Sequence, residues 1–224
     1  MARNGANGSK SEVTASTSTP GKSDDGSSPR LQGMDSNPQG SFGPKFWQAF
    51  RNSVTHIYDA VSLPDPSEEA RFTLAGRTYA TPRAVLMHCK GTAFNMARGP
   101  ALAARSADQI LIILQTAGSV DLDYSGRRER RQVGDVEVVD YAQPYNGAAA
   151  DYELLMLLLM RECVPAALRT LDLPGLIFPR EGGAARLIGA AMQELFAQAD
   201  NLTVSEAEAA VDGIVALTTS CARA

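Results

Sequence analysis

The sequence has few of the side chains that bind metals or cross-link a chain. It contains two histidines, His56 and His88, and three widely spaced cysteines, Cys89, Cys163 and Cys221. No CxxC or HxH pair occurs. The sequence therefore predicts neither a thiolate metal site, nor the histidine-rich centre of a metal-dependent β-barrel enzyme, nor a disulfide framework. We expect no metal, no cofactor, and a reducing cytoplasm as the compartment.

Long apolar runs and an excess of basic residues are also absent. The longest apolar run covers residues 154–160, far short of the ~18–20 residues that a membrane-spanning helix needs. No apolar signal segment follows Met1. The formal net charge of -4 gives the chain as a whole no attraction to nucleic acid or to an anionic membrane. We expect no membrane partner.

Motifs for nucleophilic and acid–base catalysis are missing as well. No Gly-x-Ser-x-Gly elbow occurs, and His88 and Cys89 are neighbours on a predicted strand, where adjacent side chains point to opposite faces. Asp121 and Asp123 share one strand face, but it is the polar face, which indicates solvated surface rather than a catalytic pair. The chain is predicted to be a binding and assembly module and not an enzyme.

Composition divides the chain into three parts. Residues 1–41 are dominated by Gly, Ser, Thr, Pro, Asn and Asp, and such a segment buries too little apolar surface to fold. We predict a disordered tail there, with a regulatory or targeting arm as the alternative. Residues 42–178 are predicted to form one domain, rich in strands, and residues 179–224 a helical element.

The first element of the middle part is predicted to be a helix. Pro44 suits a first helical turn, and apolar residues from Phe46 to Val61 recur at helical spacing. Pro64 and Pro66 then end the pattern.

The residues that follow have the period of strands. Val120, Leu122 and Tyr124 alternate with polar residues, which is typical of a half-buried strand. Residues 110–115 are continuously apolar, and residues 152–160 are apolar on both faces, which predicts a central strand. Turn signals recur about every ten residues, so this part predicts an antiparallel barrel or sandwich.

The C-terminal part returns to helical spacing. Residues 184–199 form one predicted helix, and Thr203 and Glu206 make a capping box that opens a second, antiparallel one. After Leu187 the only basic residue is Arg223, beside several acidic residues. DNA would repel such a pair, whereas its apolar, alanine-rich faces favour packing against a second copy of the chain.

One basic cluster, residues 127–131, falls on a predicted hairpin. It has neither interleaved aromatic residues nor a helix that could enter a groove. We interpret it as a solvated hairpin edge whose charges discourage pairing with other strands. Contact with a phosphate or another anion is the alternative.

Several motifs carry a family resemblance. Residues 107–115, Gly118, residues 133–135, Asp140 and residues 144–145 follow one another along the chain, and a helical tail runs from residue 187 through 202–203 to 217. In this order and spacing they resemble the N-terminal sensor domain of AraC-type (AraC/XylS) transcription regulators. The resemblance covers roughly residues 46–219, nearly all of the chain behind the predicted tail.

The resemblance implies an α+β fold: a cupin-like antiparallel jelly-roll β-barrel, preceded by a helix and followed by an antiparallel helical pair. It implies that residues 42–178 bind a small-molecule effector and that residues 179–224 form a homodimer. In that family a following domain with two helix-turn-helix units reads DNA. This sequence ends at Ala224. We therefore expect a truncated regulator, which would contact DNA only through a C-terminal domain absent here.

Within this scheme no catalytic residue is assigned. The candidate ligand-pocket residues are His88, Tyr124, Tyr141 and Tyr145. The candidate dimer-interface residues are Ile188, Met192, Leu195, Val211 and Ile214. An apolar interior with a few tyrosines favours an aromatic or fatty effector over a sugar.

Two other functions remain open at this point. One is a metal-independent small-molecule enzyme on the cupin barrel, with proton transfer by one of the pocket candidates. The other is an inhibitory partner that forms mixed dimers with a full-length regulator.

Overall fold

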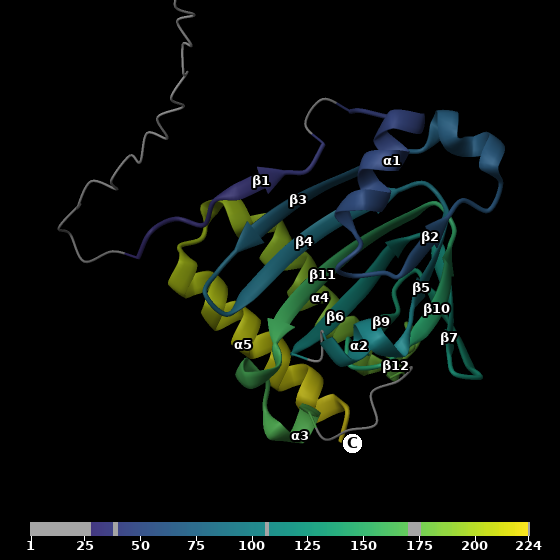
Figure 1. Ribbon diagram of the computed structural model, residues 1–224. Coiled ribbons are helices and arrows are strands. Elements are labelled where there is room, and N and C mark those ends of the chain that lie inside the picture. Colours follow the sequence, from purple (N-terminus) through teal and green to yellow (C-terminus); the bar gives the residue numbers. More distant parts are fainter. Residues whose placement is uncertain (1–27, 38–39, 106–107, 170–175, 224) are drawn as a thin grey trace, which may run out of the picture.

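The computed structural model describes residues 28–37, 40–105, 108–169 and 176–223, which form two antiparallel β-sheets and several helices (Figure 1). The first sheet has seven strands, in the order β1 (Gly33–Asp35), β3 (Leu74–Ala80), β4 (Ala84–Gly91), β11 (Tyr152–Met160), β6 (Gln109–Ala117), β9 (Val136–Asp140) and β12 (Leu176–Phe178). The second sheet has five strands, in the order β2 (Ala60–Ser62), β5 (Phe94–Arg98), β10 (Tyr145–Ala149), β7 (Ser119–Tyr124) and β8 (Arg127–Gln132).

The helices lie at the two ends of the chain and in the connections. The α-helices are α1 (Pro44–Ser53), α2 (Pro100–Arg105), α3 (Ala166–Arg169), α4 (Gly183–Gln198) and α5 (Val204–Cys221). Short 3₁₀ helices are η1 (Pro66–Arg71), η2 (Arg161–Cys163) and η3 (Ala199–Asn201).

Helix α1 begins at Pro44 as predicted but is shorter than its apolar stripe. The stripe continues to Val61, whereas the helix ends at Ser53 and residues 60–62 form strand β2. The chain leaves the helix because sheet pairing replaces helical hydrogen bonds: the Asp59 amide donates to Ala97 O at 2.8 Å, beside strand β5. Tertiary pairing overrides the local helical period here.

The seven-stranded sheet is covered on both faces, and this explains its continuously apolar strands. On β6, Ile110, Ile112 and Leu114 pack toward the helices, whereas Leu111 and Ile113 face the second sheet. Strand β11 lies fourth of the seven strands, so the prediction of a central strand is confirmed. Alternate residues of one strand therefore belong to two different hydrophobic clusters.

Helices α4 and α5 pack side by side on the outer face of the seven-stranded sheet (Figure 1). Gly189 allows a close approach of α4 to β6, since a Cβ there would lie 3.3 Å from Leu114 Cδ1. The predicted capping box is confirmed at the start of α5: the Thr203 hydroxyl accepts from the Glu206 amide, and the Glu206 carboxylate accepts from the Thr203 amide.

The segment before α1 corrects the boundary of the predicted tail. Residues 33–35 form strand β1, which pairs with β3, and Leu31 is 4% exposed in the cluster beneath the helices. The Leu31 amide donates to Leu202 O, and the Val204 amide donates to Pro29 O. Residues 28–35 thus join the turn between α4 and α5 to the edge of the sheet. Of the rest of the predicted tail, residues 1–27 and 38–39 lie outside the described residues.

An ion pair strengthens this junction and makes its stability depend on pH. Asp200 Oδ1 accepts from Arg77 Nη2 at 2.8 Å and from the Tyr79 hydroxyl at 3.1 Å. The bond from Arg77 and then the bond from Tyr79 hold the pKa of Asp200 below its usual value.

Because the folded-state pKa of Asp200 is lowered, the group stabilises the fold above its unfolded pKa and loses that contribution as the pH falls through the folded pKa. We expect Asp200→Asn to flatten the acid limb of the stability curve between pH ~5 and ~1. Urea midpoints measured across that range test this, with Arg77→Leu as the matched variant that removes the main donor. An acid limb unchanged in both variants would contradict the assignment.

The predicted fold class is confirmed. Two antiparallel sheets face one another in a cupin-like sandwich, a helix precedes it, and a helical pair follows it.

Candidate functional site

The space between the two sheets contains a cavity of about 270 Å³. The seven-stranded sheet contributes inward-facing side chains of β4, β6, β9 and β11, and the five-stranded sheet contributes those of β5, β7 and β10. Phe50 of α1 and the following residues Val54, Ile57 and Tyr58 cover one side of the cavity. Most lining side chains are apolar, and three of them are methionines: Met87, Met96 and Met156.

A buried polar network lies in the cavity wall and joins residues of β8 and β9. Glu137 of β9 is fully buried, accepts a hydrogen bond from the Tyr124 hydroxyl at 2.7 Å, and forms an ion pair with Arg131 of β8. Arg131 Nε also donates to Gln115 Oε1 at 2.9 Å. Burial raises the pKa of Glu137, and Arg131 opposes the rise. The ion pair leaves this wall with opposite charges that compensate each other.

A second polar group consists of tyrosines near α1. Tyr58 and Tyr145 both line the cavity, and the rings of Tyr145 and Tyr124 lie 5.6 Å apart. Burial raises the pKa values of Tyr58, Tyr141 and Tyr145 above the ordinary tyrosine value. Burial also raises the pKa of Cys89, another lining residue, to about 11. These groups are therefore uncharged at neutral pH.

Arg98 anchors the turn that covers the cavity. Its side chain is buried, and its guanidinium stacks 4.6 Å from the centre of the Tyr141 ring. It donates two hydrogen bonds to Tyr141 O, at 3.1 and 2.8 Å, and one to Ile57 O at 2.6 Å. The guanidinium thus ties the covering residues after α1 to the end of strand β9.

Three of the four pocket candidates from the sequence lie where a ligand could touch them. Tyr124, Tyr141 and Tyr145 all line the cavity. Their contact with a ligand stays a prediction.

His88 does not line the cavity, and its assignment to the pocket is corrected. It follows Met87 and precedes Cys89, which both face inward, so its own side chain points to the outer face of β4. There its Nε2 lies 2.5 Å from Glu153 Oε1, and the side chain is 42% exposed. The histidine is hydrogen-bonded to a carboxylate on the half-exposed outer face of the strand.

Sequence reasoning missed the two charged members of the cavity wall. Arg131 was assigned to a solvated hairpin edge, but it is 4% exposed because the strand period turns it inward, away from Arg128 and Arg130. A usable signal existed for Glu137: it is a lone carboxylate inside a run of valines, at a position of the period that faces inward. A buried carboxylate requires a partner, and Arg131 is one.

The five candidate dimer residues also lie elsewhere than expected. The structure buries all of them within one chain, between the helical pair and the sheet, with exposures from 0 to 4%: Ile188, Met192, Leu195, Val211 and Ile214. The amphipathic stripes were identified correctly, but their partner is the sheet of the same chain. In this conformation these side chains are not available to a second copy.

In the part of the chain that the structure describes, no group of three or more His, Cys, Asp or Glu side chains is gathered in a way that could hold a metal ion. Among the described helices, none combines the length and the apolar character that crossing a membrane requires.

Solved structures of other proteins are similar to this chain in fold. The AraC-like transcriptional activator CuxR superposes with a TM-score of 0.75 at 18% identity, covering 87% of this chain and 70% of that one. KdgF from Halomonas sp. gives a TM-score of 0.32 at 15% identity, covering 45% of this chain and 94% of that one. The EutQ protein of Clostridium difficile gives 0.31 at 12%, covering 40% and 64%. The last two values are too low to support an argument.

No curated protein matches the sequence. The sequence does match the AraC-binding-like domain family over residues 50–221, from within α1 to the end of α5. The match includes the sandwich, the cavity lining and the helical pair. The chain belongs to the AraC-binding-like domain family.

Proposed function

We propose that this chain senses a small-molecule effector in the cavity between its sheets and forms a homodimer through its helical pair, as a regulatory part of an AraC-type transcription regulator. The observation that carries the proposal is the shared sheet. Strands β6, β9 and β11 line the cavity with one face and support α4 and α5 with the other. An occupant of the cavity therefore contacts the same strands that position the helices.

The dimer surface proposed here is the outward face of the helical pair. Leu187 of α4 is 60% exposed, an unusual position for a large apolar side chain. Ala190 of α4 and Ala209, Gly213 and Ala216 of α5 are exposed as well. Small side chains of this kind let two helices approach closely, so the face suits a second copy of the same surface.

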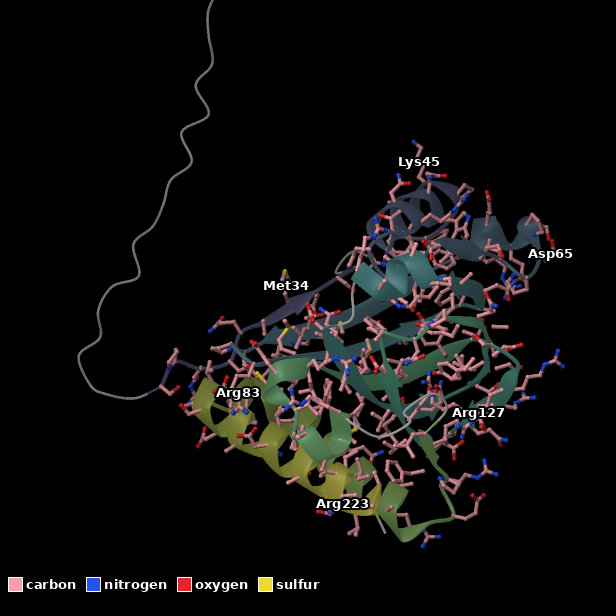
Figure 2. All side chains as sticks on the ribbon, turned by 60° about the horizontal axis from the view of Figure 1, so that its bottom comes forward. Met34, Lys45, Asp65, Arg83, Arg127 and Arg223 are labelled. Atoms are coloured by element: carbon pink, nitrogen blue, oxygen red, sulfur yellow. The ribbon has the colours of Figure 1, made fainter. Side chains whose placement is uncertain are left out.

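DNA contact through this helical pair does not belong to the proposal. The basic residues of the pair are Arg186 and Arg223, and its acidic residues are Glu194, Glu206, Glu208 and Asp212. In Figure 2, Arg83 and Arg223 lie along α5, and Arg127 of the basic hairpin lies on the other side of the molecule. The hairpin arginines Arg128 and Arg130 pair with Asp123 and Asp121, which supports a compensated surface rather than a phosphate site.

Catalysis by the cavity tyrosines is disfavoured on physical grounds. A general acid or base works best with a pKa near the operating pH. The pKa values of Tyr141 and Tyr145 are raised, further from neutrality than that of a free tyrosine. We therefore propose binding without turnover.

The dimer is tested by light scattering coupled to size exclusion. We expect a dimer for the parent chain, and a shift to monomer in Leu187→Arg and in Ala216→Arg, because each puts a charge into the proposed interface. Both positions are exposed in the single chain, so the melting temperature of the monomer should be little changed.

Val133→Arg is the matched control, since Val133 is an exposed apolar residue (46%) in the β8–β9 turn and belongs to neither α4 nor α5. A parent chain that stays monomeric at high micromolar concentration would rule out the dimer. A dimer that persists in both helix variants but dissociates in Val133→Arg would move the interface to the sandwich.

A further inference from the structure

The cavity lining restricts the chemistry of its occupant through four features: its volume, its charge, its hydrogen-bonding groups, and its aromatic and methionine side chains. The inference rests on the proposed effector function. At about 270 Å³ the cavity lies just below the ~300–1,000 Å³ typical of sites for drug-sized ligands. It has room for a single ring with a short substituent.

The buried charges of the lining disfavour an ionic occupant, and His56, which also lines the cavity, is exposed. The buried charges in the wall are Arg131 and Glu137, and they form an ion pair with each other. Both Glu137 oxygens are engaged, one by Arg131 and one by the Tyr124 hydroxyl, and Arg131 also donates to Gln115. A charged ligand would lose its hydration without gaining an uncompensated counter-charge.

The other polar side chains of the lining are tyrosines together with His56, Cys89 and Gln109. The Tyr58 side chain lines the cavity, and its phenol carries one proton to donate. The Tyr141 hydroxyl has no hydrogen-bond partner among the described residues, although Arg98 holds the backbone of Tyr141 firmly in place. Because both groups stay protonated, they offer donors to a ligand oxygen near the turn after α1.

The rest of the lining favours a flat ring. Phe50, Phe94 and Tyr145 present aromatic faces and edges, and Met87 and Met156 add polarisable sulfur. Aromatic pairs and sulfur–aromatic contacts each contribute beyond simple apolar burial.

We propose that the cavity binds an uncharged monocyclic aromatic compound that carries one carbonyl or hydroxyl oxygen. The ring lies among the aromatic and methionine side chains, and the oxygen accepts hydrogen bonds from Tyr58 and Tyr141.

The test compares four probes of similar size by isothermal titration calorimetry and thermal shift on the full chain. Acetophenone has the proposed features, benzoate adds a charge, cyclohexyl methyl ketone removes aromaticity, and glucose replaces apolar surface with hydroxyls. We expect saturable binding of acetophenone, binding of the saturated ketone about 2- to 10-fold weaker, and binding of benzoate more than ~100-fold weaker. Glucose should not bind.

Variants link this binding to the assigned hydroxyls. Tyr141→Phe and Tyr58→Phe should each weaken acetophenone binding about 2- to 10-fold, because each removes one donor. Tyr79→Phe is the matched control, since its hydroxyl bonds to Asp200 outside the cavity and its loss should leave binding unchanged. Tyr58 is half-buried, so its variant is expected to fold even if the variant at Tyr141 does not.

The outcomes separate this inference from the proposed function. Tighter binding of benzoate or glucose than of acetophenone would overturn the neutral aromatic class and leave effector binding standing. Equal binding of acetophenone to the parent chain and to both cavity variants would overturn the role of the two hydroxyls. If none of the four probes binds, the ligand class is overturned, whereas the dimer measurement still decides the assembly half of the proposed function.

Discussion

Replacing Glu137 with leucine should lower the free energy of unfolding by ~3–5 kcal/mol. Glu137 is fully buried, and its partner Arg131 is 4% exposed, so the substitution leaves a guanidinium in the protein interior without its counter-charge. The hydrogen bond to Gln115 remains, but a neutral amide oxygen does not compensate a full charge. Urea unfolding followed by circular dichroism measures the effect, and the slope of the transition should stay unchanged.

The double variant Glu137→Leu with Arg131→Met is the informative companion. Replacing a buried ion pair by apolar side chains is often neutral or stabilising, so the double variant should recover most of the lost stability. Asp121→Ala is the matched control, because it removes the exposed partner of Arg130, 3.6 Å away, and should cost no more than ~1 kcal/mol. A loss below ~1 kcal/mol for the single variant would mean that water reaches Arg131 from the cavity that it lines and compensates its charge.

Ile188→Ala should lower the free energy of unfolding by ~2–5 kcal/mol, through lost apolar burial and the cavity that is left. Ile188 of α4 is fully buried in the cluster that joins the helical pair to the seven-stranded sheet. The loss should be independent of protein concentration, because the partner surface belongs to the same chain. Urea unfolding at two protein concentrations tests both the magnitude and this independence.

The neighbouring residue provides the control for this second prediction. Leu187 is 60% exposed, so Leu187→Ala should change the stability of the monomer by less than ~0.5 kcal/mol. If Ile188→Ala instead dissociated a dimer and left the stability of the monomer intact, the helical stripe would face a second copy, as the sequence alone suggested.

The period of the sequence was sufficient to predict most of the elements. Alternation of Val120, Leu122 and Tyr124 corresponds to strand β7, and the capping box at Thr203 and Glu206 marks the start of α5. These signals are local, because side chains within a few residues determine them. The order of these elements predicted an antiparallel barrel or sandwich, and the family resemblance implied the cupin-like class.

The parts that could not be predicted depend on contacts distant in sequence. The period of β4 shows that His88 and Cys89 point to opposite faces, but not which face is the inner one. Only the position of the second sheet decides this, and it turns Cys89 inward. The turn after α1 also depends on a distant contact, because the Arg98 side chain donates a hydrogen bond to the backbone of Ile57, 41 residues earlier in the chain.

The partner surface of the helical pair could not be predicted from the sequence either. An apolar stripe such as that of Ile188 and Met192 requires burial, but the stripe does not identify what buries it. The sequence suggested a second copy of the chain, whereas the structure gives the outer face of the seven-stranded sheet. The outward face of the helical pair, which includes Leu187, has no strong apolar stripe in the sequence. It is identified as a candidate interface because the structure shows that the inward face is buried.

The seven-stranded sheet packs against the cavity on one face and against the helices on the other, and this arrangement constrains the evolution of its sequence. On β6, an effector in the cavity would contact Leu111 and Ile113. The helices pack on Ile110, Ile112 and Leu114. Selection for a new effector can therefore act on every second residue, while the residues between them stay under selection for assembly. Alternate residues of β6 are therefore under two different selection pressures. A shift of the strand register by one residue would turn the cavity-facing residues toward the helices and the helix-facing residues toward the cavity.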